Sequence, residues 1–165
     1  MNIRITALCL VLACPLACQT TSTDRSDIER YQTGALALLD DLAAGRPLTQ
    51  IRDRAQHLSE LSQTILGDFA VRYPPCGRYL NDALGVMKKL DTLTLEEIER
   101  DYHADGALPD APDFCYHAKD LIVHPATVIL LTREPDTELT RGRISAEIQE
   151  VRAHVGQVQT LLDDS

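Results

Sequence analysis

The sequence predicts an all-α domain: a helical bundle of about four main helices with an irregular middle region held by a disulfide. Three stretches of the 165-residue chain repeat apolar residues three and four positions apart, the spacing of one face of an α-helix. No segment has the alternation typical of a half-buried strand, and no Asn-Gly turn joins two apolar runs. Helices with one apolar face bury it against other helices, so we expect helix-on-helix packing.

The first two helices are predicted from their apolar stripes and their end signals. Ser26 or Asp24 can cap the first helix, and Gly45 and Pro47 end it. Its stripe consists of Ile28, Tyr31, Ala35, Leu38 and Leu42. The second helix is expected from about residue 49 to 72, where a Pro-Pro pair follows. Its stripe consists of Ile51, Ala55, Leu58, Ile65 and Phe69.

The middle region, residues 74–136, is less regular. Residues 77–90 have helical spacing, and Thr94 with Glu97 forms a capping box that starts a short helix ending near His103. A loop over residues 105–112 follows.

Another helix is predicted from Asp113, where Pro125 should cause a kink near His124 or a restart, because proline lacks a backbone donor. The last helix has the clearest apolar stripe, and Thr140 or Ser145 can cap it after a turn at Gly142. That stripe consists of Ile144, Ile148, Val151, Val155, Val158 and Leu162.

The first 17 residues have the three parts of a secretory signal. A cationic start at Arg4 precedes an apolar run from Ile5 to Ala13, and small residues follow before Cys18. The run is shorter than the roughly 20 apolar residues that a transmembrane helix needs. We therefore expect export without a permanent membrane span.

The end of this leader, Leu16-Ala17-Cys18, resembles the lipobox of bacterial lipoproteins. The resemblance implies a signal peptide over 1–17 and a lipid anchor, with palmitate among its chains, on Cys18. A polar tether over 18–25 and a single helical domain over 26–165 would follow. Gln19 after the cysteine implies the outer membrane, with the domain facing the periplasm. The resemblance is confined to the leader, and Cys14 is a competing lipidation position.

Counting the thiols favours Cys18. The five cysteines lie at 9, 14, 18, 76 and 115, and cleavage before Cys18 leaves Cys76 and Cys115 as one pair. In an oxidising compartment these two are expected to form a disulfide, worth about 4 kcal/mol at most by loop entropy. Two separate buried thiols are the alternative. A cysteine metal site is disfavoured because neither residue belongs to a CxxC pair.

The charge of the chain excludes some partners. The precursor has 16 basic and 25 acidic residues; removing Arg4 with the leader leaves 15 against 25, a net charge of −10. Nucleic acid is a poor partner for such a surface, and attachment to the membrane would depend on the lipid anchor. With no Trp and two Phe, the chain lacks the aromatic platforms of a single-strand binder.

One constellation could bind a ligand. His117, Asp120 and His124 lie at i, i+3 and i+7 on one helical face, and His103 precedes them on a segment that the disulfide draws near. Imidazole and carboxylate are ligands for zinc and other divalent transition metals, although the specific metal is open. The i+7 pair is about 10 Å apart along the helix, which disfavours one shared ion. Structural hydrogen bonds are the favoured alternative, and acid–base catalysis is a third.

The other candidate side chains are expected to be structural. His57 and His154 each adjoin an apolar stripe and are predicted to lie on its edge or solvated flank. Lys119 is expected to form an ordinary surface ion pair with Asp120 or Asp113.

The favoured hypothesis is a binding or structural role in the cell envelope, through a protein partner there. A metal- or small-molecule-binding protein using the His/Asp cluster is the alternative, and an enzyme with histidine acid–base chemistry is a second. The sequence lacks the Gly-x-Ser-x-Gly, His-Glu-x-x-His, phosphate-loop and Gly-x-Gly-x-x-Gly motifs, so no catalytic residue is assigned. No cofactor is expected, with a divalent transition metal as the exception.

Overall fold

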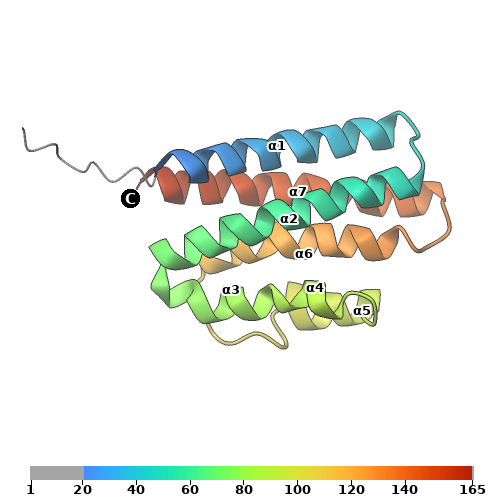
Figure 1. Cartoon of the computed structure of the whole chain (residues 1–165). Helices are drawn as coiled ribbons and strands as arrows, with labels where there is room; N and C mark the ends of the chain where they lie inside the picture. The colour runs from blue at the N-terminus through green and yellow to red at the C-terminus, as the bar shows by residue number, and fades with distance from the viewer. Residues whose placement is uncertain (1–20, 165) are drawn as a thin grey trace, which may run out of the picture.

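The computed structural model describes residues 21–164, and four long helices form its antiparallel bundle (Figure 1). The helices are α1 (Thr21–Ala43), α2 (Leu48–Arg72), α6 (Cys115–Leu131) and α7 (Glu138–Asp163). Helix α6 packs between α2 and α7, and α1 closes the ring by packing on the same two helices. No strand occurs within residues 21–164. The predicted all-α bundle is confirmed.

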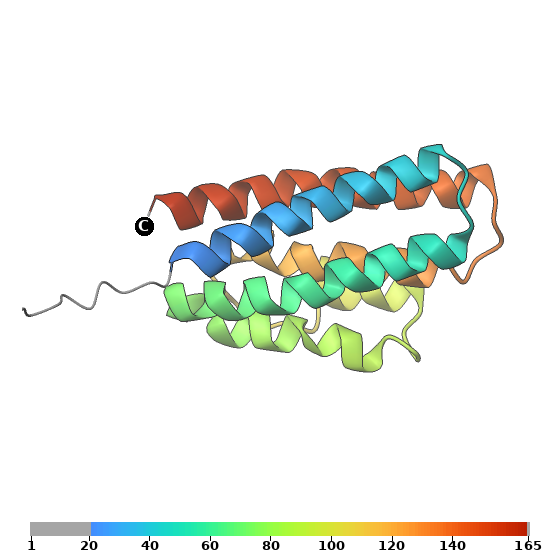
Figure 2. The same ribbon diagram turned by 45° about the horizontal axis from the view of Figure 1, so that its top comes forward.

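The middle region forms an additional layer of short elements on the outer side of α6 (Figure 2). It consists of η1 (Pro74–Cys76), α3 (Gly77–Ala83), α4 (Gly85–Lys89), α5 (Leu95–Ile98) and the π-helical turn η2 (Glu99–His103). Helix α6 therefore has neighbours on all sides, and residues 118–131 are buried without exception. The most enclosed helix of the bundle is thus the one that carries Asp120 and His124.

Helix α6 passes through Pro125 without interruption, so the predicted restart is wrong. Proline deprives the carbonyl of Leu121, four residues earlier, of its helical donor. Two side chains from other helices replace it: the Tyr31 hydroxyl donates to Leu121 O at 2.6 Å, and the Ser62 hydroxyl donates to it at 2.5 Å. The buried acceptor is thereby satisfied by α1 and α2, which explains how the helix continues.

Other helix ends differ by a few residues from those expected. Helix α1 begins at Thr21, so residues 21–25 of the expected tether are helical. Helix α7 begins at Glu138 with Thr137 as its cap, and Gly142 lies inside the helix and not in a turn. The capping box of Thr94 is confirmed, because its side chain accepts from the Glu97 backbone while the Glu97 carboxylate accepts from Thr94 N.

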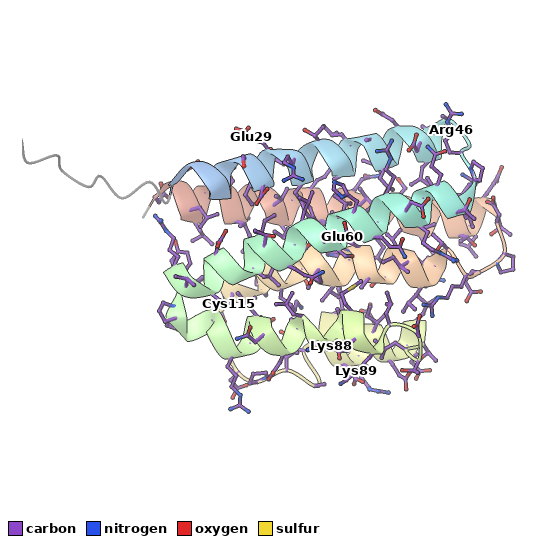
Figure 3. All side chains as sticks on the ribbon, in the orientation of Figure 1. Glu29, Arg46, Glu60, Lys88, Lys89 and Cys115 are labelled. Atoms are coloured by element: carbon purple, nitrogen blue, oxygen red, sulfur yellow. A yellow bond between two sulfur atoms is a disulfide. The ribbon has the colours of Figure 1, made fainter. Side chains whose placement is uncertain are left out.

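The Cys76–Cys115 disulfide is confirmed, with the two Cα atoms 5.6 Å apart. It joins η1 to the first residue of α6, at the end of the molecule where Figure 3 labels Cys115. The bond fixes the start of the short-helix layer against the central helix. None of the described helices is both long and apolar enough to cross a membrane. The predicted signal peptide, Cys18 and the alternative Cys14 lie outside the described residues.

Candidate metal site between helices α6, α7 and turn η2

Two antiparallel helices face each other with matched ladders of polar side chains. On α6 the ladder is His117, Asp120 and His124; on α7 it is Glu147, Glu150 and His154, with the same i, i+3, i+7 spacing. Because the helices run in opposite directions, His124 meets the glutamates, and Asp120 and His117 meet His154. The ladders are made of groups that ligate metals or transfer protons.

Lys119 is buried beside Asp120 on α6, and its hydrogen bonds connect α6 to turn η2. Its side chain is 1% exposed, and its ammonium donates to Tyr102 O at 3.0 Å, His103 O at 2.8 Å and Asp105 Oδ1 at 3.0 Å. The predicted surface ion pair is therefore a buried anchor. By holding the carbonyl of His103 itself, Lys119 sets where the His103 ring lies against α6.

The turn after η2 is specialised for this contact. Asp105 adopts the left-handed conformation, with φ 60°, and its carboxylate also accepts from the Tyr79 hydroxyl at 2.8 Å. Burial and this hydrogen bond raise the pKa of Tyr79. At Gly106 a Cβ atom would lie 2.5 Å from Arg100 O, so only glycine fits there. The turn brings the end of η2 back onto Lys119.

Asp120 keeps one oxygen without a hydrogen bond. Its Oδ1 lies 3.0 Å from Lys119 Nζ, but the three ammonium protons already have three other acceptors. Asp120 Oδ1 is consequently attracted by the charge and accepts no hydrogen bond, and it is sealed from solvent. The carboxylate is thus paired by charge with Lys119, while this oxygen keeps a lone pair for a further donor or cation.

His124 has the same property at one ring nitrogen. Its Nδ1 lies 2.8 Å from Glu147 Oε2, so the N–H is directed at the carboxylate. This contact leaves Nε2, which is fully buried and has no hydrogen-bond partner. Metal-binding histidines commonly donate their second N–H to a carboxylate in this way, which fixes the tautomer and the ring orientation.

His103 completes a group of three. One ligand atom from each of His103, Asp120 and His124 lies within 4.8 Å of those of the other two. The His103 and His124 rings meet edge to face with centroids 4.9 Å apart. Ligands on one tetrahedral zinc ion are about 3.3 Å apart, given bonds of about 2.0–2.1 Å, so small side-chain rotations would close the group on an ion.

His154 and His117 form an adjoining pair. Their Nδ1 atoms are 3.0 Å apart, so one ring donates and the other accepts. Burial lowers the pKa of His154 to about 4, against the opposing effect of Asp120, and burial also lowers the pKa of His117. Both rings are therefore neutral at pH 7, which is the protonation state that binds metals.

The structure brings together all four predicted site residues, with an arrangement that differs from the predicted one. His103, Asp120 and His124 form the close group, while His117 joins through His154. The predicted solvated position of His154 is wrong, since its side chain is 16% exposed and lies on the cluster. His57 lies exposed on α2 with Glu60 as its partner, away from the site, as its flank position predicted.

One spacing in the sequence, shared with the predicted pair Asp120 and His124, could have found the missing His154. Asp120 and His124 are four residues apart, and so are Glu150 and His154. An i, i+4 pair places both side chains over one turn, where they can reach one ion. The sequence prediction weighed the unfavourable i+7 pair of histidines instead.

The cluster is richer in negative than in positive charge. Five carboxylates contact its histidines or Lys119, against the single ammonium; they belong to Glu99, Asp105, Asp120, Glu147 and Glu150. A divalent cation would lower this imbalance.

A neighbouring pocket of about 470 Å³ is lined by Tyr79, Asp105, Asp110, Asp113 and Tyr116, among others, and by no histidine. It presents no imidazole to a substrate, so it gives no support to the acid–base enzyme hypothesis.

Comparisons of the chain with protein-family models, with curated proteins and with solved structures found no match.

Proposed function

We propose that this chain is a lipid-anchored helical bundle of the bacterial cell envelope that binds a divalent transition-metal ion at His103, Asp120 and His124. One observation carries the metal proposal. Asp120 Oδ1 and His124 Nε2 are buried without hydrogen-bond partners. Their residues, with His103, form the one group of three potential ligands in the described chain, with one ligand atom of each within 4.8 Å of the others.

A purely structural role accounts for Asp120 in part, through its ion pair with Lys119, and poorly for His124 Nε2. Leaving a buried polar group unsatisfied costs about 1–3 kcal/mol, and an apolar pair of similar shape avoids that cost. A bound ion satisfies both atoms at once. The Glu147 carboxylate that orients His124 then acts as the outer partner that raises the basicity of the ring.

The metal proposal is tested on the full exported protein, purified in detergent and stripped with a chelator. Calorimetric titration with Zn²⁺, confirmed by competition against a chromophoric chelator, is expected to show one equivalent bound tightly. His103→Ala should weaken binding by at least about tenfold. His57→Ala is the matched control, because His57 is an exposed helical histidine whose contact is Glu60.

His103 is 30% exposed, so its loss should leave the fold intact, which circular dichroism checks. His124→Ala, folded to the same criterion, should abolish tight binding. Equally weak binding by the wild type and both site variants would sink the proposal.

The envelope location rests on the leader and is tested separately. Mass spectrometry of the mature protein is expected to show an N-terminal acylated Cys18, one disulfide and no free thiol. An unmodified N-terminus, or acylation at Cys14, would overturn the proposed anchor.

A further inference from the structure

We infer that His154 is a fourth ligand and that the ion sits in a closed site of three histidines and Asp120. This inference rests on the proposed metal site and specifies its coordination. His154 lies on α7, and its Nε2 is 3.5 Å from Asp120 Oδ2. The ring also stacks on that of His124, with centroids 5.4 Å apart.

The three histidines have the same arrangement of ring nitrogens. Each has its Nδ1 engaged by an outer group: Glu99 Oε1 at 3.3 Å from His103, Glu147 Oε2 at 2.8 Å from His124, and His117 Nδ1 at 3.0 Å from His154. Each ring therefore keeps Nε2 for another partner, and on His154 this atom faces Asp120 Oδ2. Metal-binding histidines commonly have one ring nitrogen held by an outer group while the other binds the ion. The three rings share this arrangement, which supports a common metal site.

Asp120 is the residue on which the three histidine ligands converge. Its Oδ1 has no hydrogen bond, and its Oδ2 faces His154. If His117 donates to His154 Nδ1, the His154 Nε2–H faces Asp120 Oδ2. The tautomer that binds a metal is the other one: His154 donates its Nδ1 proton to His117, its Nε2 lone pair faces the carboxylate, and these two acceptors, 3.5 Å apart, need a cation between them. A metal ion supplies that cation.

His154 must turn inward when the ion binds, because it is outside the three residues whose ligand atoms lie within 4.8 Å of one another. Its Nε2 starts 3.5 Å from Asp120 Oδ2, beside one of the proposed ligands. His117 is only partly buried and can follow the ring. The ion would thereby connect α6, α7 and η2.

Four protein ligands around one ion indicate which metals would bind and whether the site is structural or catalytic. Zn²⁺ and Co²⁺ accept tetrahedral nitrogen and oxygen ligands, and a structural zinc site keeps no open position for water, unlike a catalytic one. The site is therefore one for holding an ion, and the bound metal should raise the thermal stability of the bundle.

The test is titration of the metal-stripped, full exported protein with Co²⁺, followed in the visible spectrum. We expect one equivalent and the intense bands of four-coordinate Co²⁺. His154→Gln and His154→Ala should each weaken affinity by at least about tenfold and reduce the band intensity, as water enters the fourth position. His117→Ala should weaken affinity without changing the bands, and His57→Ala should match the wild type.

The outcomes separate this inference from the proposed function. No tight binding by the wild type removes both. Wild-type binding that His154→Gln leaves unchanged in affinity and spectrum overturns the fourth ligand alone, as does a stoichiometry of two ions. The spectral change is decisive, because a merely structural contribution of His154 would alter stability and leave the coordination unchanged.

Discussion

Replacing Lys119 by Met tests how the site is built. The substitution keeps the aliphatic stem and removes an ammonium that is 1% exposed. Three hydrogen bonds are lost, two of them to the carbonyls of Tyr102 and His103. The two carboxylates that faced Lys119 respond differently, because Asp105 is 45% exposed and can be rehydrated, whereas Asp120 is 6% exposed and cannot.

The expected cost follows mainly from Asp120. Removing one partner of a buried ion pair costs about 3–5 kcal/mol, because the remaining charge stays uncompensated. We expect the free energy of unfolding of the metal-free protein to fall by that amount, and the Tm to fall by roughly 6 to 20 °C. Adding Asp120→Asn to Lys119→Met should recover a large part of the loss, since it removes the stranded charge.

Urea unfolding followed by circular dichroism at pH 7.5 with chelator present measures both variants. Lys88→Met is the matched control, an exposed lysine at the edge of the short-helix layer where Figure 3 labels it, and should change stability by less than about 0.5 kcal/mol. A loss below about 1 kcal/mol for Lys119→Met, or no recovery on adding Asp120→Asn, would refute the buried-anchor reasoning.

Three further results are expected. Replacing Cys76 and Cys115 with Ala should lower the Tm by roughly 8 to 16 °C, from at most about 4 kcal/mol of loop entropy; a loss of 2 °C or less on a calorimeter would contradict this. Tyr31→Phe should cost about 1–3 kcal/mol in urea unfolding because Leu121 O loses a donor, and a neutral result would show that Ser62 suffices. The lowered pKa of His154 means that the folded state favours the neutral ring, so the free energy of unfolding of the metal-free protein should be highest above pH 6.5 and fall toward pH 4. The fall should be larger in the wild type than in His154→Gln. Parallel pH profiles of the two proteins would count against this role of His154.

The bundle could be predicted from the sequence because each long helix has a local apolar period. The stripes of α1, α2 and α7 are buried as expected, except that Leu42 at the end of the α1 stripe and Leu162 at the end of the α7 stripe are only partly buried. The disulfide could be predicted from thiol parity, and the capping box at Thr94 from two residues three apart. These features depend on short-range spacing or on counting, and both can be read without knowing which helices are neighbours.

The site could be predicted only in part, because its assembly depends on neighbours that the sequence does not specify. His154 lies on the flank of the apolar stripe of α7, so its helix alone predicts an exposed side chain. In the structure α6 packs over it and leaves it 16% exposed. Lys119 looks like a surface residue until η2 folds over it with two backbone carbonyls. The sequence predicts a break at Pro125 because proline removes a helical donor. The hydroxyls of Tyr31 and Ser62, which replace that donor, come from other helices, and the sequence does not specify them as neighbours.

Helix α6 breaks the rule that the most enclosed helix carries the fewest polar side chains. Lys119, Asp120 and His124 are all buried there, on a helix whose other buried residues are mostly apolar. Lys119 is fully satisfied and has a structural reason, because it anchors η2. Asp120 Oδ1 is paired by charge with Lys119 but accepts no hydrogen bond. His124 Nε2 has no hydrogen-bond partner at all, and its burial weakens the metal-free fold.

Departures from packing rules are concentrated at functional sites, because binding and catalysis need polar groups that an apolar core does not contain. The violation here is confined to one edge of α6, and the surrounding groups orient it: Glu147 holds His124, and Lys119 holds the segment of His103. An ion bound at that edge would satisfy both unpaired atoms and couple α6 to η2. These two atoms are therefore the strongest reason to expect that the protein is completed by a metal.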